Sequence, residues 1–116
     1  MNVIFFEVDG ILNFKDSEAL APDGTMGIAE SRVKALRRYV DATNSRLVLY
    51  GSWCKDWDFN DALCTPKGIY LNKKLSRRGL HILEKVKTGE TVQDWLARHQ
   101  NIEQHIVLKP EGEWFE

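Results

Sequence analysis

The chain lacks the features that would place it in a membrane or on a nucleic acid. Its longest apolar runs, such as Val3–Phe6 and Leu47–Tyr50, are too short to span a bilayer. The N-terminus has no basic segment followed by a long apolar stretch, so no signal peptide is indicated. A formal net charge of -1 gives no general attraction to nucleic acid or to an anionic membrane.

Cysteine is scarce, and no linker or repeat divides the chain. Cys54 and Cys64 show no zinc-ligand pattern, and two cysteines alone do not make a disulfide framework. The length of 116 residues suits one domain over residues 1–116, and an apolar fraction of 43% is that of a globular protein. These properties predict a cytoplasmic protein that does not bind membranes.

Apolar runs and helical periodicity alternate along the chain. The elements expected are a strand at Val3–Phe6, a polar loop over Asn13–Gly27, a helix over Ala29–Ala42, a strand at Leu47–Tyr50, an irregular or short helical stretch over Trp53–Gly68, a helix over Leu71–Arg78, a strand at His81–Lys85, a helix over Glu90–His99 and a strand at His105–Leu108. This order predicts an α/β fold of three layers, in which helices flank a Rossmann-like parallel sheet with right-handed crossovers.

Two carboxylates and a glycine follow the first predicted strand. Because side chains alternate along a strand, Glu7 and Asp9 would leave its end on the same side, and Gly10 permits a tight turn. Two acids in one small site need a cation or a shared proton, and Mg²⁺ takes one or two carboxylates together with phosphate oxygens. The alternative is a strand that ends in an acidic turn, because Asp-Gly is a common turn pair.

Several other polar residues also follow predicted strands. Sites in open parallel sheets form beyond the carboxyl ends of the strands. Glu7, Asp9, Gly51, Ser52 and Lys109 all occupy such positions. We therefore expect the fold to bring them together at one edge of the sheet.

Three stretches resemble motifs of the haloacid dehalogenase-like (HAD) phosphohydrolases. Glu7–Gly10 is similar to the first motif, usually Asp-x-Asp-Gly, and Leu47–Trp53 to the second, a strand that ends in a phosphate-binding Ser or Thr. Lys87–Leu96 is similar to a third region, in which a helix begins with Arg-Gly and a Trp-Leu pair follows. The resemblance spans nearly the whole chain and implies a HAD-like domain without a sizeable cap.

The resemblance also implies roles for the acidic residues. Glu7 stands at the position of the nucleophile, Asp9 at that of the general acid/base, and both would hold Mg²⁺ in an active phosphomonoester hydrolase. An uncapped site would be open to a phosphorylated small molecule or macromolecule.

The expected phosphate-binding residues are Gly51, Ser52 and Lys87. Either Ser52 supplies the hydroxyl of the second motif, or that hydroxyl is lost to Gly51. Lys87 lies one position before Thr88, which aligns with the basic residue of the family. A lysine there would neutralise phosphate charge.

Two positions depart from the family pattern. Glu7 replaces an aspartate, and its extra methylene would move the attacking oxygen by about 1 Å, which can cost roughly a hundredfold in rate. Lys109, followed by Pro110, stands where a metal-binding acid belongs, and its ammonium could take the place of the cation between Glu7 and Asp9. Glu111 or Glu113 could substitute for the missing acid.

These departures predict a degenerate HAD-like protein with weak or absent Mg²⁺-dependent phosphatase activity and weak or absent Mg²⁺ binding. The alternative is a non-enzymatic module that uses the same fold to bind phosphate or protein.

Overall fold

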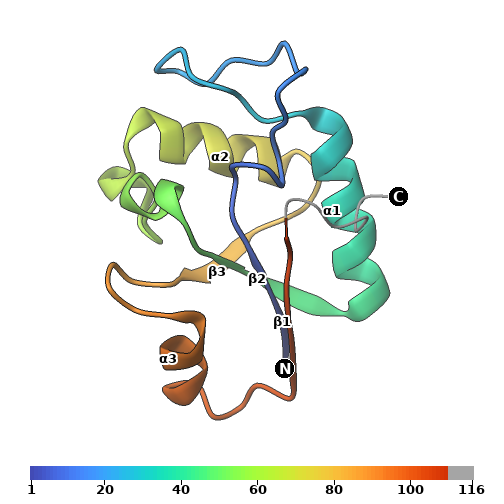
Figure 1. Cartoon of the computed structure of the whole chain (residues 1–116), viewed down its shortest axis with the longest axis vertical. Helices are drawn as coiled ribbons and strands as arrows, with labels where there is room; N and C mark the ends of the chain where they lie inside the picture. The colour runs from blue at the N-terminus through green and yellow to red at the C-terminus, as the bar shows by residue number, and fades with distance from the viewer. Residues whose placement is uncertain (110–116) are drawn as a thin grey trace.

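The computed structural model describes residues 1–109 and contains a four-stranded parallel sheet with the strand order β3-β2-β1-β4 (Figure 1). The elements are β1 (Asn2–Phe6), α1 (Glu30–Thr43), β2 (Ser45–Leu49), the 3₁₀ helices η1 (Ser52–Lys55) and η2 (Asp61–Leu63), α2 (Pro66–Ser76), β3 (Ile82–Lys85), α3 (Val92–Ala97) and β4 (Gln104–Val107). The predicted α/β fold with a Rossmann-like parallel sheet is confirmed.

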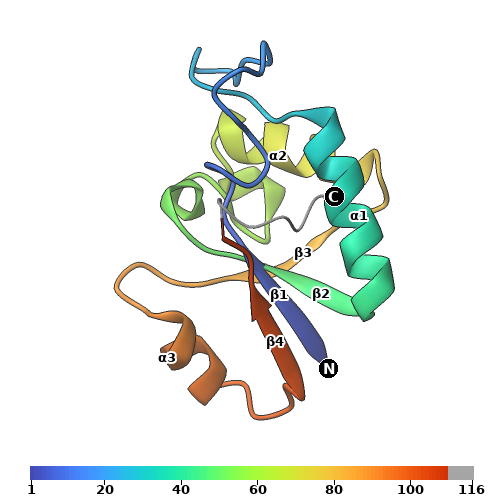
Figure 2. The same cartoon turned by 45° about the vertical axis from the view of Figure 1, so that its right-hand side comes forward.

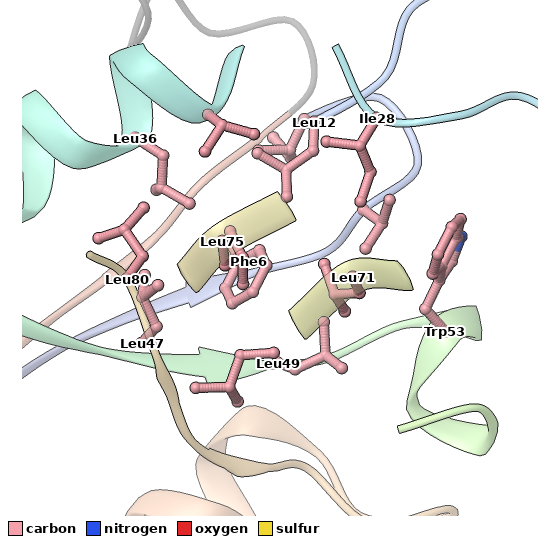
Figure 3. Close-up of a cluster of buried hydrophobic side chains, with 14 of the residues drawn as sticks. Phe6, Leu12, Ile28, Leu36, Leu47, Leu49, Trp53, Leu71, Leu75 and Leu80 are labelled. Carbon is pink, nitrogen blue, oxygen red and sulfur yellow. The ribbon is translucent and has the colours of Figure 1, made fainter. Parts of the chain in front are cut away.

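Helices cover both faces of the sheet, which explains why its central strands are continuously apolar. Ile4 and Phe6 of β1 point to the face covered by α1 and α2, where they join a core that includes Leu36 and Leu71 (Figure 3). Phe5 points to the opposite face, where α3 packs. Figure 2 shows α3 on the far side of the sheet from α1 and α2, so the molecule has three layers.

Trp95 is the centre of the smaller core, on the α3 face. Its side chain is fully buried, and its ring meets that of Phe5 edge to face with 5.3 Å between centroids. His99 stacks on the same indole at 3.7 Å, and its imidazole also lies 2.9 Å from a carboxylate oxygen of Glu84. His99 is therefore a packed residue of this layer.

Helix α2 begins earlier than the sequence predicted. We expected irregular structure up to Gly68 and a helix from Leu71, whereas α2 starts at Pro66. Proline is favoured in the first turn of a helix, because its missing N–H would have no partner there and its backbone is already helical. The pair Thr65-Pro66 is thus a helix start, and the irregular stretch before it contains two short 3₁₀ helices.

Helix α3 is shorter than predicted, because its start is fixed by a capping box. Thr91 accepts a hydrogen bond from the Asp94 amide, and the Asp94 carboxylate accepts one from the Thr91 amide, each at 3.0 Å. This arrangement satisfies two backbone donors at the helix N-terminus. Thr91 is thus the N-cap residue of α3.

Strand β3 pairs irregularly with β2. Ile82 is opposite Leu47 and Glu84 is opposite Val48, so the pairing passes over Leu83. An extra residue in one strand of a pair bends that strand and increases its twist. Within residues 1–109, every helix is too short or too polar to cross a bilayer.

We predict that Trp95→Ala lowers the free energy of unfolding by about 3–5 kcal/mol, because it removes the largest buried side chain and leaves a cavity. Urea denaturation followed by circular dichroism measures the change. The control is Gln93→Ala on the exposed side of α3, which we expect to change stability by less than about 0.5 kcal/mol. Equal effects of the two substitutions would contradict the role of Trp95 as the core of this layer.

Candidate functional site

The Asp9 carboxylate lies where the turn after β1 meets η1 at the carboxyl edge of the sheet. One oxygen accepts hydrogen bonds from the Asn13 amide at 3.0 Å and from the Trp53 indole N–H at 3.1 Å. The other accepts a hydrogen bond from the Ser52 hydroxyl at 3.0 Å. The first and second motifs are therefore joined directly, and the predicted proximity of Asp9 and Ser52 is found in the structure.

Asn13 holds the turn that presents Asp9. Its side chain is fully buried, and its carbonyl oxygen accepts a hydrogen bond from the Gly10 amide at 2.8 Å. Gly10 has φ of +84°, a conformation that glycine adopts without steric cost. The buried amide of Asn13 thus links Gly10, Asp9 and the turn between them into one unit.

The pKa of Asp9 reflects these hydrogen bonds. Partial burial of the carboxylate raises its pKa, but hydrogen bonds from Asn13, Trp53 and Ser52 outweigh this effect, together with the charge of Lys67. The pKa is therefore below its ordinary value. Asp9 is held as a carboxylate that accepts hydrogen bonds from the protein.

The pKa of Glu7 is shifted in the opposite direction to that of Asp9. Burial and the neighbouring charge of Asp9 raise the pKa of Glu7, and the Tyr50 hydroxyl offsets part of the increase. The same hydroxyl donates a hydrogen bond to the Leu108 carbonyl at 3.1 Å. Glu7 is half-buried and takes up a proton more readily than a free glutamate does.

Gly51 lies directly against Glu7. A Cβ atom at this position would be 2.7 Å from a Glu7 carboxylate oxygen and 2.9 Å from the Glu7 Cβ, and the φ angle of Gly51 is +91°. Contacts of that length do not occur between real side chains, so a serine at position 51 would not fit. Of the two alternatives for the second motif, the structure favours Ser52 as the hydroxyl, although Ser52 already donates to Asp9.

The three predicted phosphate-binding residues line one cavity. Gly51, Ser52 and Lys87 contribute to a cavity of about 520 Å³ between the end of β2 and the loop that follows β3. Lys55 supplies a second basic side chain to its wall. Glu7 and Asp9 contact Gly51 and Ser52 from the adjoining side, so the structure brings the predicted site residues together.

Lys109 does not take the place of a cation between the two acids. Within residues 1–109, its side chain is exposed and makes no ion pair with Glu7 or Asp9. The lysine whose charge acts on Asp9 is Lys67 of α2, which the sequence did not indicate. Its ammonium lies 4.1 Å from the centre of the Trp53 ring and 3.4 Å from an Asp23 carboxylate oxygen.

Asn13, Trp53 and Lys67 complete the site beyond the residues predicted from sequence. Asn13 carried a local signal, because an asparagine just after an Asp-Gly turn can bond back to the turn. Trp53 was noted only as a neighbour of Ser52. Lys67 carried no signal, because its contacts to Asp23 and Trp53 come from distant parts of the chain.

The predicted Mg²⁺ ligands are the carboxylates of Glu7 and Asp9. No cluster of three or more His, Cys, Asp or Glu side chains that could hold a metal occurs within residues 1–109. Of the two predicted carboxylate ligands, Asp9 already accepts three hydrogen bonds from protein donors. Glu111 and Glu113, the possible substitutes for the missing acid, lie outside the described residues.

We predict that Asn13→Ala raises the pKa of Asp9, because it removes one of the donors that stabilise the carboxylate. In the wild type, the lowered pKa contributes stability above about pH 4 that is lost as the pH falls toward the folded-state pKa. Because the pKa of Asp9 in the folded variant is closer to its pKa in the unfolded chain, the variant loses less stability on acidification. NMR titration of the Asp9 carboxyl carbon and urea denaturation at several pH values measure both effects.

The control for Asn13→Ala is Asn101→Ala, an exposed asparagine at the opposite edge of the sheet, which should leave the Asp9 titration unchanged. An unaltered Asp9 pKa in Asn13→Ala would show that Asn13 does not stabilise the carboxylate.

We predict that Gly51→Ser destabilises the protein by about 1–3 kcal/mol, the range for a residue forced into a backbone conformation that only glycine adopts freely. Steric contact with Glu7 adds to this cost. The matched control is Gly24→Ser, at φ of +85° but with no atom within 4 Å of an added Cβ. Thermal unfolding compares them, and equal losses would exclude a contribution from the contact with Glu7.

No protein-family model, curated protein or solved structure matches the chain. The resemblance to HAD phosphohydrolases therefore remains a prediction from the sequence motifs.

Proposed function

We propose that this protein is a HAD-like domain that binds a phosphorylated ligand at the carboxyl edge of its sheet and hydrolyses phosphomonoesters weakly or not at all. The observation on which this depends is the Asp9 carboxylate, which accepts hydrogen bonds from Asn13, Trp53 and Ser52. The strand order and the convergence of the motif residues support the assignment to a phosphate-binding fold.

Asp9 is poorly suited to general acid catalysis in this arrangement. A general acid works best when its pKa is near the working pH, so that it carries a proton to donate to the leaving group. The pKa of Asp9 is instead held below its ordinary value, and both of its oxygens already accept hydrogen bonds. The residue is better explained as a connection between the first and second motifs.

Glu7 is poorly suited to nucleophilic attack. Its longer side chain displaces the carboxylate by about 1 Å relative to an aspartate, a misplacement that can cost roughly a hundredfold in rate. Its raised pKa also increases the protonated fraction, which is not nucleophilic. A protonated Glu7 could instead donate a hydrogen bond to a phosphate oxygen.

The cavity beside these acids retains the groups that anion binding needs. Lys55 and Lys87 line it together with Ser52, so two ammonium groups and a hydroxyl border the same space. A phosphorylated small molecule or the phosphorylated end of a macromolecule would suit this site. We place the protein in the cytoplasm, in keeping with the free thiols of Cys54 and Cys64.

We predict that the wild type hydrolyses p-nitrophenyl phosphate at or near the background rate, with or without Mg²⁺, and that Glu7→Ala does not change this rate. In the same samples, inorganic phosphate should shift the amide NMR signals of Gly51 and Ser52, because these residues line the proposed binding cavity. Glu103→Ala, at the opposite end of the sheet, is the control.

Mg²⁺-dependent turnover that disappears in Glu7→Ala but persists in Glu103→Ala would show an active phosphohydrolase. Absence of phosphate-induced shifts would instead contradict phosphate binding.

A further inference from the structure

Lys67 lies between the loop that follows β1 and the site around Asp9. Its ammonium is 4.1 Å from the centre of the Trp53 ring and 3.4 Å from a carboxylate oxygen of Asp23. The Lys67 side chain is 18% exposed, whereas that of Asp23 is 45% exposed. The lysine is therefore held against the protein, and its acidic partner is open to water.

Trp53 connects Lys67 to the site. One face of the indole ring lies against the Lys67 ammonium, and its N–H donates a hydrogen bond to Asp9 at 3.1 Å. Ser52, the neighbour of Trp53 in the chain, donates to the other oxygen of Asp9. One aromatic side chain thus separates Lys67 from the proposed phosphate-binding hydroxyl.

We infer that Lys67 is a cationic ligand-binding residue of this site and that Asp23 competes with the phosphorylated ligand for it. The inference rests on the proposed function, which it extends by naming a regulated contact. In the ligand-free protein, Asp23 neutralises Lys67. When phosphate binds near Ser52, Lys67 exchanges the Asp23 carboxylate for a phosphate oxygen.

The strength of the two contacts favours this exchange. The Lys67–Asp23 ion pair lies at the surface, with its acidic partner open to water, and ion pairs of this kind contribute little to stability, so it can open at small cost. A hydrogen bond from an ammonium group to a phosphate oxygen is among the stronger polar contacts in proteins. The other oxygen of Asp23 accepts hydrogen bonds from the Thr25 amide and hydroxyl, so the carboxylate stays ordered when Lys67 leaves it.

The Lys67–Asp23 ion pair also connects the loop that follows β1 to helix α2. Asp23 is at the tip of a small turn closed by a bridge between Leu20 and Met26, and Figure 1 shows this loop extending beyond α2. In residues 1–109, the ion pair with Lys67 is the direct link between Asp23 and α2. Exchange of partners by Lys67 would therefore free the turn around Asp23 from α2 when ligand binds, while the Ile28 amide still donates to the Tyr70 hydroxyl of α2.

The experiment titrates inorganic phosphate into ¹⁵N-labelled protein at constant ionic strength and follows the Trp53 indole N–H and the Thr25 amide. The variants are Lys67→Met, which keeps an apolar side chain over Trp53 but removes the charge, Asp23→Asn and the combination of the two. Lys73→Met on the exposed side of α2 and Asp16→Asn in the same loop as Asp23 are the matched controls.

We expect Asp23→Asn to tighten phosphate binding by up to about fivefold, the range that an exposed ion pair supports. Lys67→Met should weaken binding by at least about tenfold, as expected for loss of a charged hydrogen bond, and Asp23→Asn should give no gain in that background. Thermal unfolding verifies that each variant is folded, and Lys67→Arg should restore part of the affinity.

Two results would overturn the inference. If Lys67→Met binds phosphate as Lys73→Met does, Lys67 is not a ligand-binding residue, and if Asp23→Asn binds it as Asp16→Asn does, Asp23 does not compete for Lys67. Either result overturns the inference, and the proposed function stands. If neither the wild type nor Asp23→Asn binds phosphate, the proposed function itself fails, and the inference with it.

Discussion

The carboxylate of Asp9 is the interaction on which the arrangement of the site depends. Of its three donors, Asn13 lies in the turn after β1, and Ser52 and Trp53 belong to η1. One side chain therefore fixes the relative positions of two loops. Hydrogen bonds to a charged group contribute about 1.5–3 kcal/mol each. Through these three hydrogen bonds the Asp9 carboxylate connects the turn after β1 to η1.

Glu7 and Gly51 are best understood as a pair. Each departs from the sequence pattern of the HAD phosphohydrolases, and the structure places them in direct contact. The space that a serine side chain would need at position 51 is filled by the carboxylate of Glu7. Glycine at position 51 is therefore what allows the longer side chain of Glu7 to lie against this turn.

Much of the fold could be predicted from the sequence, because the central strands are continuous apolar runs and such runs indicate strands buried on both faces. The convergence of Glu7, Asp9 and Ser52 could be predicted for a related reason, since the carboxyl ends of parallel strands meet at one edge. The start of α2 was predicted too late, because Thr65-Pro66 was included in the irregular or short helical stretch over Trp53–Gly68. The role of Lys67 could not be predicted, because it depends on contacts between segments that only the folded chain brings together.

The irregular pairing of β3 has a consequence for how the protein behaves at high concentration. β3 is at the edge of the described sheet, and a flat edge strand offers unpaired backbone groups to a second molecule. The extra residue at Leu83 bends this strand, and Lys85 folds back to donate to the Cys54 and Trp57 carbonyls. A bent edge that ends in a lysine is a poor template for strand addition, which protects the domain from aggregation through this side of its sheet.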